Sequence, residues 1–173
     1  MKPAEMGTLL LSQAVITLFA VLVAYIKLKQ EIKKSREEKV YELRLDRLKR
    51  QLSEFYGPLH MLSRSTTDIA KTAWGTDIWE RTWREIILPS HQQIEAILLN
   101  KIDLLDEPEI PQSYFDFLRH YKVNWSYLET GFGPSYFEKQ TPYPANFNQD
   151  ISAAYERKRK EYLELVQTVE LAN

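Results

Sequence analysis

The chain has 173 residues, of which 44% are hydrophobic and 27% charged, with a formal net charge of −1 and no cysteine. Without cysteine, disulfides, thiol nucleophiles and thiolate metal ligands are excluded. The near-neutral balance gives no electrostatic footprint for duplex nucleic acid, so none is expected as a partner. The five glycines fit no phosphate-binding loop, and we expect no cofactor.

Residues 8–26 (TLLLSQAVITLFAVLVAYI) form an uncharged apolar stretch near the N-terminus. A helix of this length measures ~28 Å, close to the ~30 Å hydrocarbon core of a bilayer. The next segment is crowded with basic residues: Lys27, Lys29, Lys33, Lys34, Arg36 and Lys39. Because basic residues favour the cytoplasmic side, we predict a single-pass protein of the inner (cytoplasmic) membrane, with residues 1–7 outside and the C-terminal part in the cytoplasm. A cleaved signal peptide is the alternative, but its basic residues would precede a shorter apolar core.

One side of this apolar stretch carries small or polar residues at spacings of four, three and four: Gln13, Thr17, Ala20 and Ala24. Small side chains let membrane helices approach closely, and a buried amide can form a hydrogen bond across the contact. The stripe therefore predicts a helix–helix interface in the bilayer and a homo-oligomer. The alternative is that Gln13 reaches the lipid headgroups.

Residues 27–56 contain no helix breaker and are rich in good helix formers, which predicts a stalk helix that continues the membrane helix. A coiled-coil-like seam runs along this segment through Tyr41, Leu45, Leu48, Leu52 and Phe55. The seam would pack either on another subunit or on later helices of the same chain. We expect the pair Gly57-Pro58 to end the stalk, and residues 57–173 to form one cytoplasmic helical domain.

This domain is expected to be all-α, because no alternating strand pattern is present. Helices are predicted over residues 58–74, ended by Gly75, and over residues 111–129. Between them lies a helical segment that is interrupted by Pro89 and yet keeps its apolar phase. Asn148 is expected to cap the last helix, whose apolar seam would pair with that of the stalk.

The sequence shows no pattern of catalytic residues or metal ligands. The three histidines, His60, His91 and His120, fall on three different predicted helices, and none has a second ligand at metal-binding spacing. No serine lies in a nucleophile elbow. The acidic connector of residues 103–109 lacks the glycine turn of a calcium loop, which favours a solvated loop. We therefore expect a protein that is not an enzyme.

Two groups of basic residues stand out, one on the predicted stalk and one on the last helix. If these helices pair, the arginines would line a shared positive surface, and guanidinium groups suit phosphate. Aromatic residues of the Pro-rich stretch 131–148 would stack on a base. The predicted ligand-binding residues are Arg44, Arg47, Arg50, Arg157, Arg159, Tyr136 and Tyr143. The alternative is a solvated helix face, because acidic residues are interleaved with the basic ones.

Residues 47–64 (RLKRQLSEFYGPLHMLSR) resemble a segment of small bacterial single-pass membrane proteins of unassigned function. In those proteins a span leads through a basic helix into an EFYGPL-type break and then a helical domain. The layout also resembles membrane effectors of prokaryotic antiviral defence, including accessory proteins of type III CRISPR systems that sense a cyclic oligoadenylate. The resemblance implies no catalytic residue.

Taken together, these features predict a membrane-anchored, oligomeric sensor or effector. Its cytoplasmic domain would bind an anionic ligand, such as a nucleotide second messenger in antiviral defence, and would act on the membrane through the transmembrane helix. The alternative function is a passive membrane scaffold that docks a soluble protein partner.

Overall fold

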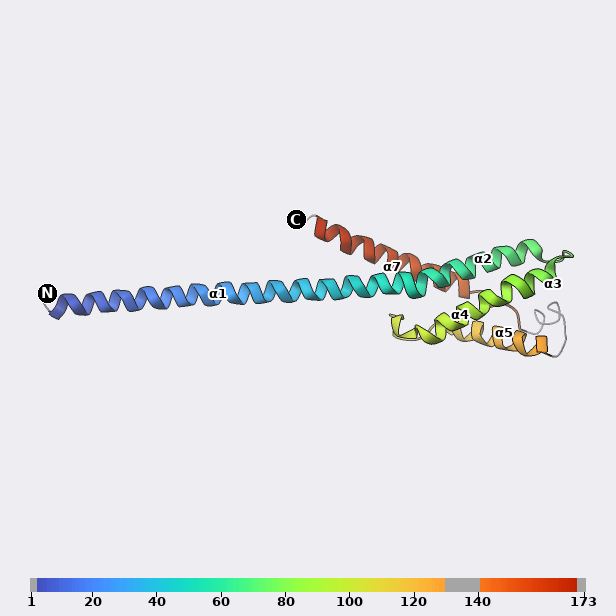
Figure 1. The fold of residues 1–173 in the computed structure, drawn as a ribbon, viewed down its shortest axis with the longest axis horizontal. Helices are drawn as coiled ribbons and strands as arrows, with labels where there is room; N and C mark the ends of the chain where they lie inside the picture. The colour runs from blue at the N-terminus through green and yellow to red at the C-terminus, as the bar shows by residue number, and fades with distance from the viewer. Residues whose placement is uncertain (1–2, 130–140, 171–173) are drawn as a thin grey trace. The chain divides into compact units, whose positions relative to one another are not determined.

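The computed structural model describes the backbone of residues 3–129 and 141–170 and the side chains of residues 18–126 and 141–168. All regular secondary structure in these described residues is helical, which confirms the all-α class. Figure 1 shows these helices along the chain from α1 (Pro3–Arg50) to α7 (Phe147–Glu170). The chain divides into two units, Met1–Arg44 and Leu45–Asn173. The second unit thus begins upstream of Gly57, where the sequence places the start of the helical domain.

The first unit consists of most of helix α1 (Pro3–Arg50). Its large apolar side chains between residues 18 and 28 are exposed; Leu18 is 75% exposed and Phe19 66%. Within the part of the chain that the structure describes, no helix has a stretch that is long and apolar enough to cross a membrane.

The predicted helix–helix stripe lies partly outside the described side chains. Gln13 and Thr17 belong to the part of α1 for which only the backbone is described, whereas Ala20 and Ala24 are exposed. The contact between copies of the chain therefore stays a prediction.

The second unit contains the C-terminal end of α1 followed by short and long helical segments. In chain order these are η1 (Gln51–Tyr56), α2 (Gly57–Ala73), α3 (Trp79–Thr82), η2 (Trp83–Ile87), α4 (Leu88–Asn100), η3 (Ile102–Leu104), α5 (Gln112–Glu129) and α7 (Phe147–Glu170). Segments η1 and η2 are π-helical, and η3 is a 3₁₀ turn. Helix α4 packs on α2 and on α5, and helix α7 packs on η1, α2 and α5.

Contrary to the sequence prediction, the pair Gly57-Pro58 does not end the helix. Gly57 keeps helical angles (φ −63°, ψ −54°), and helical structure passes from α1 through η1 into α2. Proline lacks the N–H that an α-helix would use to bond the fourth residue back. The wider π turn accommodates this loss, because the Gly57 N–H bonds the carbonyl oxygen of Leu52, five residues back. A Cβ at position 57 would lie 2.3 Å from that oxygen, so the turn requires glycine.

Pro89 is accommodated in the same way. The π-helical η2 precedes α4, and the Leu88 N–H bonds the carbonyl oxygen of Trp83, again five residues back. The helical structure therefore continues through Pro89 without a break. The predicted apolar phase is preserved, since Trp83, Ile87 and Ile94 are all buried.

Two predicted helix ends have different outcomes. Gly75 follows α2 with φ +74°, which confirms it as the stop of that helix. Helix α7, however, begins at Phe147, so Asn148 lies inside the helix and is not its cap. The Asn148 side chain instead joins elements: its Nδ2 donates to Thr67 Oγ1 at 2.6 Å, and its Oδ1 accepts from the Tyr143 hydroxyl at 2.8 Å.

The core of the second unit is rich in aromatic rings. Phe117 and Phe147 stack with centroids 4.4 Å apart and an interplanar angle of 11°, which joins α5 to α7. Leu48 and Phe55 of the predicted seam are buried, and the Phe55 ring lies 6.5 Å from that of Tyr114. Of the two predicted alternatives, this part of the seam therefore packs on later elements of its own chain.

Candidate functional site

Two of the predicted ligand-binding arginines contact the acidic connector that follows η3. The Arg47 guanidinium lies 3.5 Å from the Asp106 carboxylate, and Arg157 pairs with Glu107. The buried Lys158 ammonium lies 2.5 Å from Asp106, and this contact holds the pKa of Asp106 below its usual value. The connector is therefore more than a solvated loop, because its carboxylates pair with one basic residue of α1 and two of α7.

The other predicted ligand-binding residues lie apart from this cluster. Arg50 and Arg159 pair with acidic residues on their own helical runs, at 3.2 Å and 3.7 Å. Arg44 belongs to the first unit, and Tyr136 lies outside the described residues. Tyr143, by contrast, lines two cavities of the second unit.

His91 of α4 and His120 of α5 lie beside each other in the second unit. Their ring centroids are 5.7 Å apart, and the Tyr143 ring lies 5.8 Å from His91 and 5.5 Å from His120. Each histidine is only 4% exposed. We name these three residues the histidine junction. His60 is not part of it, because its ring packs on Tyr155 at 4.7 Å.

The spacing of the two histidines from buried apolar residues predicts that both are buried, although they match no known motif. His91 follows Ile87 of η2 by four residues and precedes Ile94 of α4 by three, so it shares the buried face that runs from η2 into α4. His120 follows the buried Phe117 by three residues on α5. Each histidine could therefore have been placed in the core, but its partner from another helix could not.

Polar partners hold the His120 ring on both nitrogens. Nδ1 lies 2.6 Å from the Thr141 carbonyl oxygen, to which it donates, and Nε2 lies 3.0 Å from Asn124 Nδ2, from which it accepts. Burial lowers the pKa of His120. Burial, together with the neighbouring His120, lowers the pKa of His91 to about 3. Both rings are therefore neutral near pH 7.

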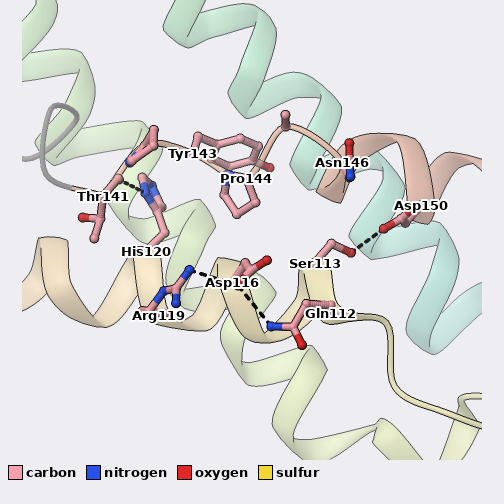
Figure 2. A pocket seen from close by; sticks show the side chains of 12 residues that line it. Gln112, Ser113, Asp116, Arg119, His120, Thr141, Tyr143, Pro144, Asn146 and Asp150 are labelled. Carbon is pink, nitrogen blue, oxygen red and sulfur yellow. Dashed lines mark hydrogen bonds and ion pairs between the residues drawn. The ribbon is translucent and has the colours of Figure 1, made fainter.

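A groove of about 790 Å³ opens beside His120 and Tyr143 (Figure 2). One wall comes from the start of α5, and the other from residues 141–146, which lead into α7. Polar side chains in the groove bond to each other. The Arg119 guanidinium lies 3.1 Å from Asp116, and the Ser113 hydroxyl donates to Asp150 at 2.6 Å. The groove is wide, and these charged side chains already have partners inside it.

A smaller cavity of about 140 Å³ is also lined by the histidine junction. Its other walls come from α2, α3 and η2, and include Trp79. Trp79 Nε1 and His91 Nδ1 have no hydrogen-bond partner among the described residues. Because buried polar atoms nearly always have a partner, these two atoms distinguish the small cavity from the rest of the core.

The arrangement offers stacking surfaces and hydrogen bonds to a small molecule. Burial raises the pKa of Tyr143, so its hydroxyl stays protonated and donates to Asn148. Over residues 18–126 and 141–168, no group of three or more metal-binding side chains could hold a metal ion. The chemistry that the site presents is therefore recognition by rings and by neutral hydrogen-bonding groups.

Comparisons with known proteins find no match to this chain among family models, curated proteins or solved structures. Nothing in them bears on the resemblance to small bacterial single-pass proteins or to antiviral membrane effectors, and both stay predictions.

Proposed function

We propose that this chain is a membrane-anchored sensor, in which the apolar part of α1 enters the inner membrane and the second unit binds a ligand at the histidine junction. The observation that supports this most directly is the exposed apolar surface of residues 18–28. Keeping such a surface in water costs about 25 cal/mol per Å². A bilayer would bury it, and the basic residues from Lys27 onward would lie among anionic headgroups.

We place the ligand at the histidine junction and not at the predicted arginines. Arg47 and Arg157 already pair with Asp106 and Glu107, so an anion would have to displace these carboxylates. The junction, in contrast, lines the small cavity together with Trp79, and His91 Nδ1 and Trp79 Nε1 have no partner in the described part of the chain. His120 and Tyr143 also line the larger groove.

Helical structure links the cavity wall to the apolar stretch along the chain. Ala70 of α2 lines the small cavity, and η1 joins α2 to α1. A ligand that binds better to one arrangement of α2 would shift the population of the membrane helix between two arrangements, provided that this helix has two. The stripe that contains Ala20 and Ala24 would then form the contact between copies.

Single-cysteine variants test the membrane anchor, because the natural chain has no cysteine. In inverted inner-membrane vesicles, a membrane-impermeant maleimide should label the Ser35→Cys variant but not the Ala24→Cys variant. Oxidation should crosslink the Ala24→Cys variant into a dimer. Equal labelling of the two variants would show that α1 does not enter the bilayer.

Coupling is tested by filling the small cavity with a larger side chain. Ala70→Leu, added to the Ala24→Cys variant, should change the crosslinking yield about fivefold, which corresponds to about 1 kcal/mol of coupling. Ala153→Leu is the matched control, since Ala153 is exposed on α7. If Ala70→Leu leaves the yield unchanged while the chain stays in the membrane, the chain acts as a passive scaffold and the sensor function is wrong.

A further inference from the structure

We infer that the small cavity of the histidine junction binds a neutral, planar molecule of a single ring that carries a hydroxyl or an equivalent hydrogen-bonding group. This inference rests on the proposed function, because it names the ligand class for the same junction. Binding itself can nevertheless be measured without any membrane readout.

The size of the cavity sets the size of the ligand. Its volume is about 140 Å³. A protein cavity of about 150 Å³ lined by apolar side chains takes up benzene, so one ring fits here. The walls include the rings of Trp79, Trp83 and Tyr143, which favour a planar aromatic guest through offset or edge-to-face contacts. A whole nucleotide is too large for this space.

The two buried nitrogens without partners favour a ligand whose ring carries a polar group. Trp79 is 7% exposed and His91 4%, and neither Trp79 Nε1 nor His91 Nδ1 has a partner in the described residues. The indole N–H can only donate, so it needs an acceptor, whereas a neutral imidazole nitrogen donates or accepts according to its tautomer. A hydroxyl group does both and satisfies either nitrogen. A buried polar atom without a partner destabilises the fold, and a ligand that supplies the partner removes that cost.

The charges around the cavity favour a neutral ligand. Lys71 is the one charged residue among those that line it, and Lys71 is exposed. Both histidines are neutral near pH 7, because burial lowers their pKa values. An ion that moved to the buried nitrogens would lose its hydration without meeting a buried countercharge there. A phenol-like ring loses far less hydration on the same path.

Binding is measured by ¹⁹F NMR with the full chain in phospholipid nanodiscs and 4-fluorophenol as the probe. We expect saturable binding that Trp79→Phe weakens about tenfold, since this change keeps a ring but removes the N–H donor. Fluorobenzene, which lacks the hydroxyl, should bind the natural chain and the Trp79→Phe variant equally. Trp125→Phe is the matched control, because Trp125 lies on α5, is 37% exposed and does not line the cavity.

A second variant keeps the inference testable if Trp79→Phe disturbs the fold. Ala70→Leu fills the cavity and should abolish binding of 4-fluorophenol, while Ala153→Leu should not. Binding that survives Ala70→Leu, or no saturable binding to the natural chain, would overturn the inference. Tighter binding of 4-fluorobenzoate than of 4-fluorophenol would overturn the neutral ligand class.

The outcomes for this inference and for the proposed function are separable. Normal 4-fluorophenol binding by a chain whose Ala24→Cys and Ser35→Cys variants label equally would overturn the membrane sensor and leave the cavity assignment standing. Protected Ala24→Cys and altered crosslinking on Ala70→Leu, without ring binding, would overturn only the cavity assignment.

Discussion

Large apolar side chains are exposed in one unit of this protein and buried in the other. In Met1–Arg44, none of the described side chains is buried, and the large apolar residues from position 18 to position 28 face outward. In Leu45–Asn173, by contrast, Phe55, Phe117 and Phe147 are 0% exposed. The second unit builds its own core, whereas the described apolar side chains of the first unit have no core of their own chain to bury them.

The difference shows that two kinds of helix occur in one chain. The first unit depends on good helix formers and on local pairs such as Lys33–Glu37, with 3.8 Å between Nζ and Oε1. The helices of the second unit depend on tertiary packing, which normally supplies most helical stability. Changes in the first unit should therefore alter where the protein resides, and changes in the second should alter how firmly it folds.

The largest effect is expected from two charges in the apolar stretch. Leu18→Lys combined with Leu22→Lys should release the chain from membranes, because each lysine near the centre of a span costs about 3 kcal/mol. Carbonate extraction and flotation measure the membrane-bound fraction. Leu43→Lys, at a position on α1 that is 59% exposed, is the control and should stay bound. Retention of the double variant in the membrane fraction would contradict the contrast between the units.

The next effect concerns the aromatic core. Phe117→Ala should lower the free energy of unfolding by about 3–5 kcal/mol, because it removes a fully buried ring that stacks on Phe147. Phe115, two residues earlier on α5, is 49% exposed and provides the matched control. Urea unfolding followed by tryptophan fluorescence measures both. Equal losses for Phe115→Ala and Phe117→Ala would mean that α5 presents a different face to the core.

A smaller loss is expected at the π-helical turn before Pro58. Gly57→Ala would place a Cβ 2.3 Å from the Leu52 carbonyl oxygen, so the backbone must shift and weaken the hydrogen bond across the turn. We expect a loss of about 3 kcal/mol in the free energy of unfolding. Ser53→Ala, at an exposed position of η1, should change it little. A Gly57→Ala variant as stable as the natural chain would show that the turn tolerates a side chain.

Acid should destabilise the second unit through His91. In the unfolded chain this histidine binds a proton below its usual pKa of 6.5, whereas in the fold burial lowers its pKa to about 3. As the pH falls, the unfolded state therefore gains the proton first. The free energy of unfolding is unaffected above about pH 7 and decreases by about 1.4 kcal/mol per pH unit below the pKa of the unfolded chain. At about pH 5 the loss is about 2 kcal/mol.

Urea midpoints measured across this range of pH check the expected loss. His91→Leu should make the dependence shallower, because the contribution of His91 is gone, while His120, whose pKa burial also lowers, keeps its own. His60→Gln should leave it in place, since His60 lies outside the histidine junction. A steep decrease that persists in the His91→Leu variant would assign the effect to other groups.

The smallest effect is expected on the exposed face of α1. Lys33→Ala should change the stability of the chain by less than about 0.5 kcal/mol, because exposed pairs one turn apart contribute little and are screened by salt. Circular dichroism melting at low and high salt measures it. A larger loss would mean that Lys33 makes a contact beyond its pairing with Glu37.

Much of the local structure could be predicted from the sequence, and the exceptions have physical causes. The stop at Gly75 and the helix of residues 112–129 follow from local residue preferences. The helix through Pro58 was missed, because a π turn depends on Gly57 making room for the Leu52 carbonyl. Asn148 was misplaced as a cap, because its side chain bonds Thr67 and Tyr143.

The candidate site was harder to predict than the helices. The basic groups of α1 and α7 are predicted to meet around a ligand, and in the structure Arg47 and Arg157 pair with Asp106 and Glu107 of the chain itself. Sequence alone could not show this, because a carboxylate of the chain and a phosphate of a ligand satisfy an arginine equally well. The histidine junction was missed because its members come from separate elements.

The sequence by itself determined the helical class, the apolar stretch of residues 8–26 and the apolar phase that continues through Pro89, because periodicity and composition are local properties. Only the tertiary structure decided which charges pair, and which histidine faces which ring. Those outcomes depend on contacts between residues far apart in the chain, such as His91 with His120 and Arg157 with Glu107, whose energies arise only after the helices have packed.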